Sequence, residues 1–345
     1  MKAAAIDLGS NSFICLVFEF DSLGQLIILD DKIILTRLSE GVDQTKNISL
    51  NAMERSKKAF EDFKDMFEKH GVQKIKAVAT SAARDSKNQK ELLNLASKYK
   101  IPVEILSGDQ EARLTYAGVR QIFQSENSNN KNDDKLQNHK NDKVGIEEQQ
   151  NQNGLIIDIG GGSTEYILVQ NGEMVDRISL DMGVVRFTER YAKGLEFKDY
   201  ESKLRLAIKN EISKNEKLME FKKSNLNIFL AVSGTPTTAA SILVNGLSDN
   251  LNNTLLKSFD VSKIEGFEIH KQDFNKLYHD YCSLKLDQRL ARYPYVEEKR
   301  ADVLPTGILI LEESLNFFKL DKYIISTRGI RHGLAYSMYN DLISC

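Results

Sequence analysis

One short stretch of the chain, LIIDIGGGSTEYILV at residues 155–169, strongly limits the structures that the sequence can adopt. Its apolar first residues are typical of a buried strand, and a second apolar segment follows a turn of small residues. The glycines of the turn lack a Cβ, so consecutive N–H groups can converge on an anion. Asp158 precedes the turn, and a carboxylate there suits phosphate binding when both share a divalent cation. The predicted phosphate-binding residues are Gly160, Gly161, Gly162, Ser163 and Thr164. A tight hairpin without a ligand is the alternative for such a glycine run.

A similar pattern occurs near the N-terminus. Residues 3–18 read AAAIDLGSNSFICLVF, with Asp7 before a turn that joins two apolar segments. The turn residues are Gly9, Ser10, Asn11 and Ser12. Two copies of strand, aspartate, small-residue turn and strand indicate an internal duplication. Two such turns that face each other would bracket one chain of phosphate groups.

Composition is that of an ordinary globular protein and adds little to this interpretation. The chain has 345 residues, of which 41% are hydrophobic, and this is enough for two cores. A formal net charge of −2 argues against a nucleic-acid partner. The three cysteines are widely spaced and show neither a disulfide pattern nor zinc-ligand spacing. No signal peptide and no apolar run of ~20 residues is apparent, so we expect a cytoplasmic protein without a membrane partner.

The two turn motifs carry a resemblance to a known family. IDLGSNS at residues 6–12 and IDIGGGSTE at residues 157–165 resemble the phosphate motifs of the exopolyphosphatase and guanosine-pentaphosphate phosphohydrolase family. That family is similar to acetate and sugar kinases, heat-shock chaperones and actin. The resemblance implies an α/β fold of two actin-like (ribonuclease H-like) domains, with mixed sheets flanked by helices around a central cleft.

The domain boundaries follow from this resemblance and from one segment of unusual composition. Residues 125–153 are rich in asparagine and lysine and nearly free of apolar residues, so we expect a disordered insertion. Domain I is then predicted for residues 1–124 plus 326–345, and domain II for residues 154–325. Periodicity further predicts a helix over residues 52–71, a hairpin within residues 26–38 and one long helix over residues 203–221.

Arg84 follows the apolar segment KIKAVAT, at the end of a strand where open α/β sheets bind ligands. Its guanidinium could bind a phosphate with two parallel hydrogen bonds, and pairing with Asp85 is the alternative. The family has a similar TSAxR segment at its phosphate channel, which implies the first role.

Glu111 lies in the segment SGDQEA, where Ser107 or Asp109 can cap a helix. A carboxylate in the first turn is favoured by the helix dipole, so we expect Glu111 to be ionised and able to position a water molecule. A purely structural place at a helix start is the alternative. The similar SGxxEA segment of the family carries its catalytic glutamate, which implies that Glu111 is catalytic.

Three further residues are candidates for the site. Glu165 could reach a metal-bound water or face solvent. Gly234, in the segment SGTPTTA after a strand, resembles the nucleotide loop of the superfamily, although a capped helix start has the same composition. Arg331 stands in Gly329-x-Arg331-x-Gly333, which is similar to a family motif and implies contact with a distal phosphate; pairing with a nearby acid is the alternative.

The resemblance implies hydrolysis of terminal phosphate from polyphosphate, or of guanosine pentaphosphate to the tetraphosphate. Mg²⁺ is the expected cofactor, with Asp7, Asp158 and Glu165 as its candidate ligands, and Mn²⁺ or an added K⁺ are alternatives. An ATP-binding actin-like kinase or a regulatory phosphate sensor is the alternative function. A homodimer is left open.

Overall fold

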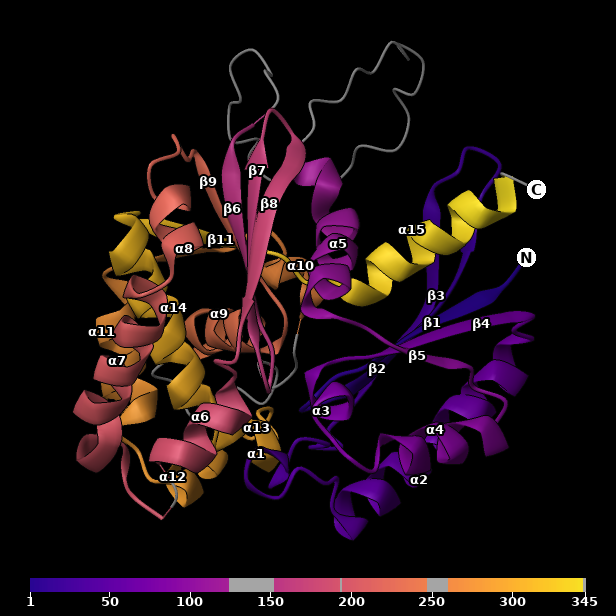
Figure 1. The fold of residues 1–345 in the computed structure, drawn as a ribbon, viewed down its shortest axis with the longest axis horizontal. Coiled ribbons are helices and arrows are strands. Elements are labelled where there is room, and N and C mark those ends of the chain that lie inside the picture. The colour runs from indigo at the N-terminus through magenta and orange to yellow at the C-terminus, as the bar shows by residue number, and fades with distance from the viewer. Residues whose placement is uncertain (124–151, 193, 247–259, 344–345) are drawn as a thin grey trace.

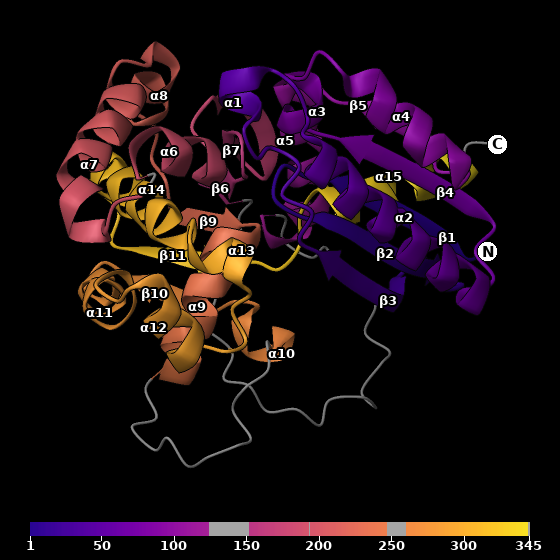
Figure 2. The same ribbon diagram turned by 90° about the horizontal axis from the view of Figure 1, so that it is seen from below.

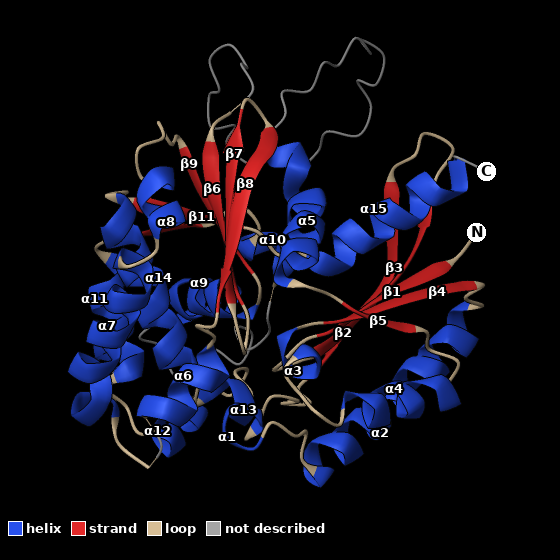
Figure 3. Ribbon diagram, in the orientation of Figure 1, coloured by secondary structure: helices blue, strands red, loops and turns tan. Residues whose placement is uncertain are grey.

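The computed structural model describes residues 1–123, 152–192, 194–246 and 260–343, which form two α/β domains (Figure 1). Most of the predicted disordered insertion lies outside the described residues. Each domain is built on one mixed sheet, and helices flank both sheets (Figure 3). The predicted fold class is therefore confirmed.

The first domain has a five-stranded sheet in the order β3-β2-β1-β4-β5. The strands β1 to β3 form an antiparallel meander, and β4 and β5 continue parallel to β1. The elements of this part of the chain are β1 (Ala3–Leu8), β2 (Phe13–Phe20), β3 (Leu26–Ile34), α1 (Val42–Thr45), α2 (Leu50–His70), β4 (Lys74–Ala79), α3 (Ser81–Arg84), α4 (Gln89–Lys98), β5 (Val103–Ile105), α5 (Gly108–Val119) and η1 (Arg120–Ile122).

The second domain has a six-stranded sheet in the order β10-β11-β9-β6-β7-β8. Its meander β6-β7-β8 and its parallel strands β9 and β11 repeat the arrangement of the first sheet, as the duplicated motif predicts. The elements of this part of the chain are β6 (Gly154–Ile159), β7 (Thr164–Gln170), β8 (Glu173–Leu180), α6 (Val184–Tyr191), α7 (Phe197–Ser213), α8 (Glu216–Phe221), β9 (Ile228–Val232), α9 (Gly234–Gly246), α10 (Val261–Ile264), β10 (Glu268–His270), α11 (Asp273–Leu277), η2 (Tyr278–Cys282), α12 (Leu286–Arg292), α13 (Glu298–Ala301), α14 (Leu304–Phe318), β11 (Lys322–Ile325) and α15 (Ile330–Ile343).

Two local predictions were wrong. Residues 26–34 form the single strand β3 instead of a hairpin, because the two aspartates expected at a turn are held by partners outside it. Asp30 binds His70 and Lys69 of α2, and Asp31 binds Arg331. The long helix expected over residues 203–221 is two helices, α7 and α8, and Asn215 between them caps α8. The helix predicted over residues 52–71 is confirmed as α2.

The helices α5 and α15 each cover the sheet of the other half of the chain. α5 packs on β7 and β8, where Tyr116 and Val119 join the core around Ile167. α15 packs on β1 and β2, where Leu334 and Met338 join the core of the first sheet (Figure 1). The predicted boundary at residue 124 therefore follows a helix that already covers the second sheet.

The two helices cross in close contact. A Cβ built on Gly118 of α5 would lie 2.4 Å from the carbonyl oxygen of Gly329, and one on Gly333 of α15 would lie 1.9 Å from that of Leu114. A side chain at either position would separate the helices, and the crossing joins the two domains.

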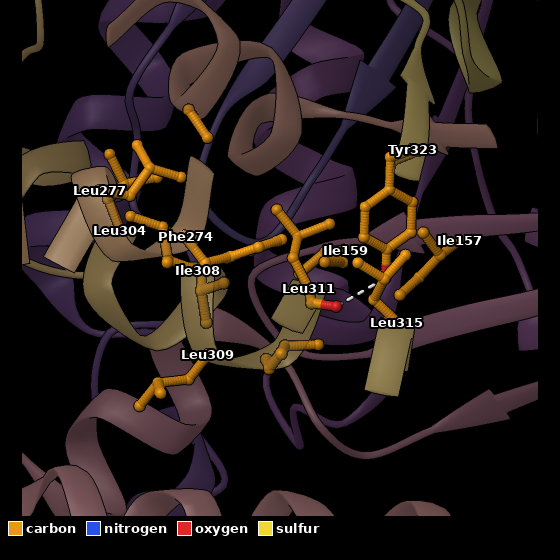
Figure 4. Close-up of a cluster of buried hydrophobic side chains, with 14 of the residues drawn as sticks. Ile157, Ile159, Phe274, Leu277, Leu304, Ile308, Leu309, Leu311, Leu315 and Tyr323 are labelled. Atoms are coloured by element: carbon orange, nitrogen blue, oxygen red, sulfur yellow. Dashed lines mark hydrogen bonds between the residues drawn. The ribbon is translucent and has the colours of Figure 1, made fainter. Parts of the chain in front are cut away.

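The largest core lies beside the second sheet, where α14 packs against β6 and the neighbouring helices (Figure 4). Leu311 and Leu315 of α14 face Ile157, and the Tyr323 hydroxyl donates a hydrogen bond of 2.6 Å to the Leu311 carbonyl. This satisfied polar group completes an otherwise apolar contact.

Within the described ranges, no helix has both the length and the apolar character that crossing a bilayer requires.

Candidate functional site

A cleft lies between the domains, at the ends of the central strands. Of the predicted site residues, all but Arg84, Gly162 and Thr164 line it: Asp7, Gly9, Ser10, Asn11, Ser12, Glu111, Asp158, Gly160, Gly161, Ser163, Glu165, Gly234 and Arg331. The fold therefore brings the two duplicated motifs, which are far apart in the sequence, to the same cleft.

The second turn, residues 160–163, is held from behind by the start of α6. The carbonyl of Gly160 accepts from the Val184 N–H at 3.0 Å, and that of Gly161 accepts from the Val185 N–H at 2.8 Å. The carbonyl of Gly162 accepts from Nε of Arg186 at 2.7 Å. Because the N–H of a trans peptide points opposite to its carbonyl, the following N–H groups face away from α6, toward the cleft.

The first turn, residues 9–12, is held in the same way by the segment after β3. The carbonyls of Ser10 and Asn11 accept hydrogen bonds from the N–H groups of Ser39 (2.9 Å) and Arg37 (2.8 Å). The N–H groups that follow are again turned away from this support. Both turns therefore present N–H groups suited to an anion.

The two turns touch each other. A Cβ on Gly161 would lie 2.9 Å from Cβ of Ser10, and one on Gly162 would lie 2.4 Å from Oγ of Ser81. The Ser10 hydroxyl lies 2.8 Å from Oγ of Ser81 and accepts from the Ala82 N–H. This packing explains why Gly162 does not line the cleft: it forms the contact between the domains.

Glu111 enters the cleft from the first turn of α5. Ser107 and Gln110 form a capping box that fixes the start of this helix. The Glu111 side chain is buried, and burial raises the pKa of its carboxyl group to about 8. Desolvation thus opposes the ionised form that the helix dipole was expected to favour at neutral pH.

Arg84 does not line the cleft but lies behind Glu111. Its Nη1 donates to the Glu111 carboxylate and to the Leu106 carbonyl (2.8 Å), while Nε lies 3.9 Å from the Asp85 carboxylate. The positive charge of Arg84 lowers the pKa of Glu111 and so opposes part of the effect of burial. The structure thus places Arg84 where it orients Glu111, and its predicted contact with phosphate stays a prediction.

Asp7 and Asp158 face each other from the two duplicated motifs. Burial and the charge of Asp158 raise the pKa of Asp7 to about 7, and its buried Oδ1 has no hydrogen-bond partner among the described residues. Asp158 accepts from Oγ1 of Thr115 at 2.7 Å and from the Ser233 hydroxyl, and burial raises its pKa. An unpartnered buried carboxylate oxygen beside a second carboxylate fits a divalent cation.

Glu165 is also buried, so it does not face solvent. It accepts from the Ser179 hydroxyl at 2.7 Å, and burial together with the charges of Glu111 and Asp158 raises its pKa well above the usual range. In the described part of the chain, no three His, Cys, Asp or Glu side chains are placed together to hold a metal ion. Asp7, Asp158 and Glu165 therefore do not form a complete ligand set on their own.

Two predicted residues have structural partners. Thr164 donates its hydroxyl hydrogen bond to the Met182 carbonyl and does not reach the cleft. Arg331 lines the cleft, yet it also binds Asp31 at 2.9 Å through Nη2, which is the acid pairing that the sequence left open. Its charge lowers the pKa of Asp7, so it contributes to the electrostatics of the site.

Sequence reasoning missed three residues of the site. Ser233, with a φ of 78°, supplies the hydroxyl that binds Asp158 and directly precedes Gly234 at the start of α9. Arg300 and Arg328 line the cleft, and the Arg300 guanidinium donates to Oγ1 of Thr238 at 3.1 Å. Burial lowers the pKa of Arg300, which forms no salt bridge with the described residues. Arg300 lies in the short helix α13 and Arg328 lies two residues before α15.

The two similar domains, the paired turns and the buried carboxylates define the class of this protein: a two-domain α/β protein whose site lies between its halves. The Ppx/GppA phosphatase family model matches residues 16–130 and 144–342. The chain belongs to this family, and the predicted resemblance is confirmed. Membership places the chain among phosphatases.

Individual relatives agree with this assignment. The chain is 28% identical to a bifunctional 3-dehydroquinate synthase/phosphatase of Fusobacterium nucleatum over 94% of its own length and 44% of that protein, so it spans less than half of that relative. It is 26% identical to a putative exopolyphosphatase of Haemophilus influenzae, over 98% of this chain and 91% of that protein. The crystal structure of an exopolyphosphatase from Cytophaga hutchinsonii has the same fold, with a TM-score of 0.77, 22% identity, and coverage of 99% of this chain and 98% of that one.

Proposed function

We propose that this protein is an exopolyphosphatase that hydrolyses the terminal phosphoanhydride bond of inorganic polyphosphate. Guanosine pentaphosphate is the second candidate substrate, since its 5′ end carries the same kind of terminal phosphate. The observation that carries the proposal is the position of Glu111, a buried carboxylate that lines the same cleft as two turns with outward N–H groups. A family of phosphatases and an exopolyphosphatase-like relative support it.

In the proposed mechanism, the N–H groups of residues 9–12 and 160–163 bind oxygens of the terminal phosphates. Glu111 accepts a proton from a water molecule as the water oxygen forms a bond to the terminal phosphorus. The bond from that phosphorus to the bridging oxygen breaks, so orthophosphate leaves and the shortened polyphosphate keeps the bridging oxygen. Arg84 holds Glu111 in position, and Arg331 and Arg300 contribute positive charge to the cleft.

Mg²⁺ is the proposed cofactor. Asp7 and Asp158 would hold it together with phosphate oxygens, which matches the usual binding of Mg²⁺ by one or two carboxylates and a phosphate. When bound, the ion would neutralise negative charge on the phosphate oxygens.

The function is tested by measuring orthophosphate release from long-chain polyphosphate, guanosine pentaphosphate and ATP in parallel, with Mg²⁺. Release from either of the first two substrates, with ATP turned over much more slowly, supports the proposal and identifies the preferred substrate. Turnover or binding of ATP alone would replace the proposal with an ATP-dependent kinase or a regulatory protein.

The pH profile should depend on Arg84. A general base acts only when deprotonated, so we expect kcat/KM to rise with pH as Glu111 loses its proton. Arg84→Gln removes the positive charge that lowers the pKa of Glu111, so the rise should move to higher pH. Arg113→Gln is the control: Arg113 lies on α5, as Glu111 does, and loses an exposed bond to Asp109, so the rise should not move. A rise at unchanged or lower pH in Arg84→Gln would contradict this role.

Removal of the metal should also have a defined effect. We expect EDTA to abolish activity and Mg²⁺ to restore it. Asp7→Asn should raise the Mg²⁺ concentration for half-maximal activity by at least ~10-fold, the lower end for loss of a metal-site partner. Asp62→Asn, which only breaks a surface pair with Lys32, is the control. Full activity in EDTA, or equal Mg²⁺ dependence of the two variants, would exclude Asp7 as a metal residue.

A further inference from the structure

Arg186, which lies outside the cleft, contacts three parts of the molecule. The side chain is only 8% exposed and extends from the first turn of α6. Nε donates to the Gly162 carbonyl at 2.7 Å, Nη1 to Asp43 at 2.7 Å, and Nη2 to Asp85. The first acceptor belongs to the second turn, and the other two belong to the first domain. Figure 2 shows α1, which carries Asp43, beside α6.

The contact with Asp85 leads directly to the proposed base. Asp85 follows Arg84 in the chain, and its Oδ1 lies 3.9 Å from Nε of Arg84, while Oδ2 binds Arg186. Arg84 in turn binds Glu111. Charges therefore alternate from Arg186 through Asp85 and Arg84 to Glu111. If Arg186 were absent, Asp85 would be free to compete with Glu111 for Arg84.

The contact with Gly162 leads to the phosphate-binding turn. The neighbouring carbonyls of Gly160 and Gly161 are held by backbone N–H groups of α6, but Gly162 depends on the Arg186 side chain. The orientation of this carbonyl fixes the direction of the next N–H group, that of Ser163. A planar guanidinium can serve several acceptors at fixed angles, which a lysine ammonium cannot do.

We infer that Arg186 is a positioning residue for hydrolysis: its guanidinium joins the second turn to Asp43 and Asp85 of the first domain, so that contact between the domains sets the geometry of both the turn and Glu111. This inference rests on the proposed function, because the geometry concerned is that of the hydrolytic site. Arg186 does not line the cleft and needs no contact with the substrate.

Arg190 provides a matched control on the same helix. It also binds Asp43, with Nε at 2.6 Å and Nη2 at 2.7 Å, but among its described contacts none reaches Gly162 or Asp85. Arg190→Gln therefore removes a bond between the domains without touching the turn or the route to Glu111.

The kinetic test compares Arg186→Gln, Arg186→Lys, Arg190→Gln and Asp85→Asn in the full chain, with polyphosphate as substrate. We expect Arg186→Gln to lower kcat by ~10²-fold, the scale of a small misplacement of reacting groups, with KM changed much less. Arg186→Lys should restore only part of the loss. Arg190→Gln should keep kcat within about twofold, because the turn and Glu111 stay in position in this variant. The double variant Asp85→Asn/Arg186→Gln should be no slower than Arg186→Gln alone. An unchanged kcat in Arg186→Gln, full rescue by lysine, or an equal loss in Arg190→Gln would overturn the inference.

A second measurement does not depend on activity. Amide hydrogen exchange of the ligand-free protein should be faster over residues 154–165 in Arg186→Gln than in wild type, and unchanged there in Arg190→Gln. If wild type releases no orthophosphate, the proposed function fails. The exchange result stands independently of activity: unchanged exchange in Arg186→Gln would overturn the inferred support of the turn. If Arg186→Gln does not fold, Arg186→Lys keeps the positive charge but loses the fixed angles of the guanidinium, and full kcat in that variant would overturn the inference.

Discussion

Glu111→Gln is expected to lower kcat for orthophosphate release by at least ~10²-fold, the lower end for loss of a general base. Glutamine has nearly the same shape and can still accept a hydrogen bond from Arg84, but it cannot take a proton from water. The buried carboxylate also lies close enough to Asp7 and Asp158 for their charges to raise its pKa. Removing its charge should therefore leave the thermal stability at pH 8 equal to or above that of wild type, which thermal unfolding would measure.

The matched control is Asp109→Asn, in the same first turn of α5. Asp109 is exposed and binds Arg113 at 3.0 Å and also Arg177, and none of the three lines the cleft. Its loss should change kcat by less than about twofold, since exposed ion pairs contribute little. Near-normal turnover in Glu111→Gln would remove Glu111 from the mechanism, whatever the substrate.

Gly183→Ala is expected to be the second most damaging substitution. Gly183 precedes α6 and has an extended backbone, with φ of −111°, so alanine is conformationally allowed there. However, its Cβ would lie 2.3 Å from the carbonyl carbon of Gly162 and 2.4 Å from that of Gly161. These are backbone atoms, so the phosphate-binding turn must shift. We expect ~10²-fold lower kcat/KM from the misplaced turn, and a stability loss of roughly 1–3 kcal/mol from overpacking.

Gly71→Ala separates these two effects. Gly71 ends α2 with φ of 68°, and nothing lies within 4 Å of the Cβ position. Alanine there should cost roughly 1 kcal/mol through backbone strain alone. Activity of the folded fraction should stay normal in Gly71→Ala and fall in Gly183→Ala. Equal activities at equal folded fractions would show that the position of the turn does not limit catalysis.

The sequence predicted those parts of the fold that depend on local patterns. The duplicated motif gave two similar sheets because each copy contains its own strands and turn, and the periodic apolar residues of α2 gave its helix. The hairpin within residues 26–38 failed because Asp30 and Asp31 owe their conformation to partners on α2 and α15. In the sequence, two adjacent aspartates at a turn cannot be distinguished from two aspartates in a strand whose side chains bind residues of distant helices.

Site residues could be predicted where they belong to a sequence motif. The role of a residue was harder to predict where it depends on partners that are distant in the sequence. Glu111 was found by its motif, but its raised pKa follows from burial, which the helix start alone does not reveal. Arg84 was assigned to phosphate because the family has a similar TSAxR segment, and the sequence did not reveal that its guanidinium binds Glu111. Arg186 gave no signal, since its three acceptors come from residues 43, 85 and 162.

The exchange of α5 and α15 between the two sheets determines the order in which the chain can fold during synthesis. The face of the first sheet that contains Ala3, Leu16 and Phe18 is covered by Leu334 and Met338. These strands are made long before α15, which covers them, so the first half leaves the ribosome with an apolar face still open. Contacts of such long sequence separation form slowly because a long loop must close first. The two halves therefore complete their cores together, and we expect them to unfold in one cooperative transition instead of two.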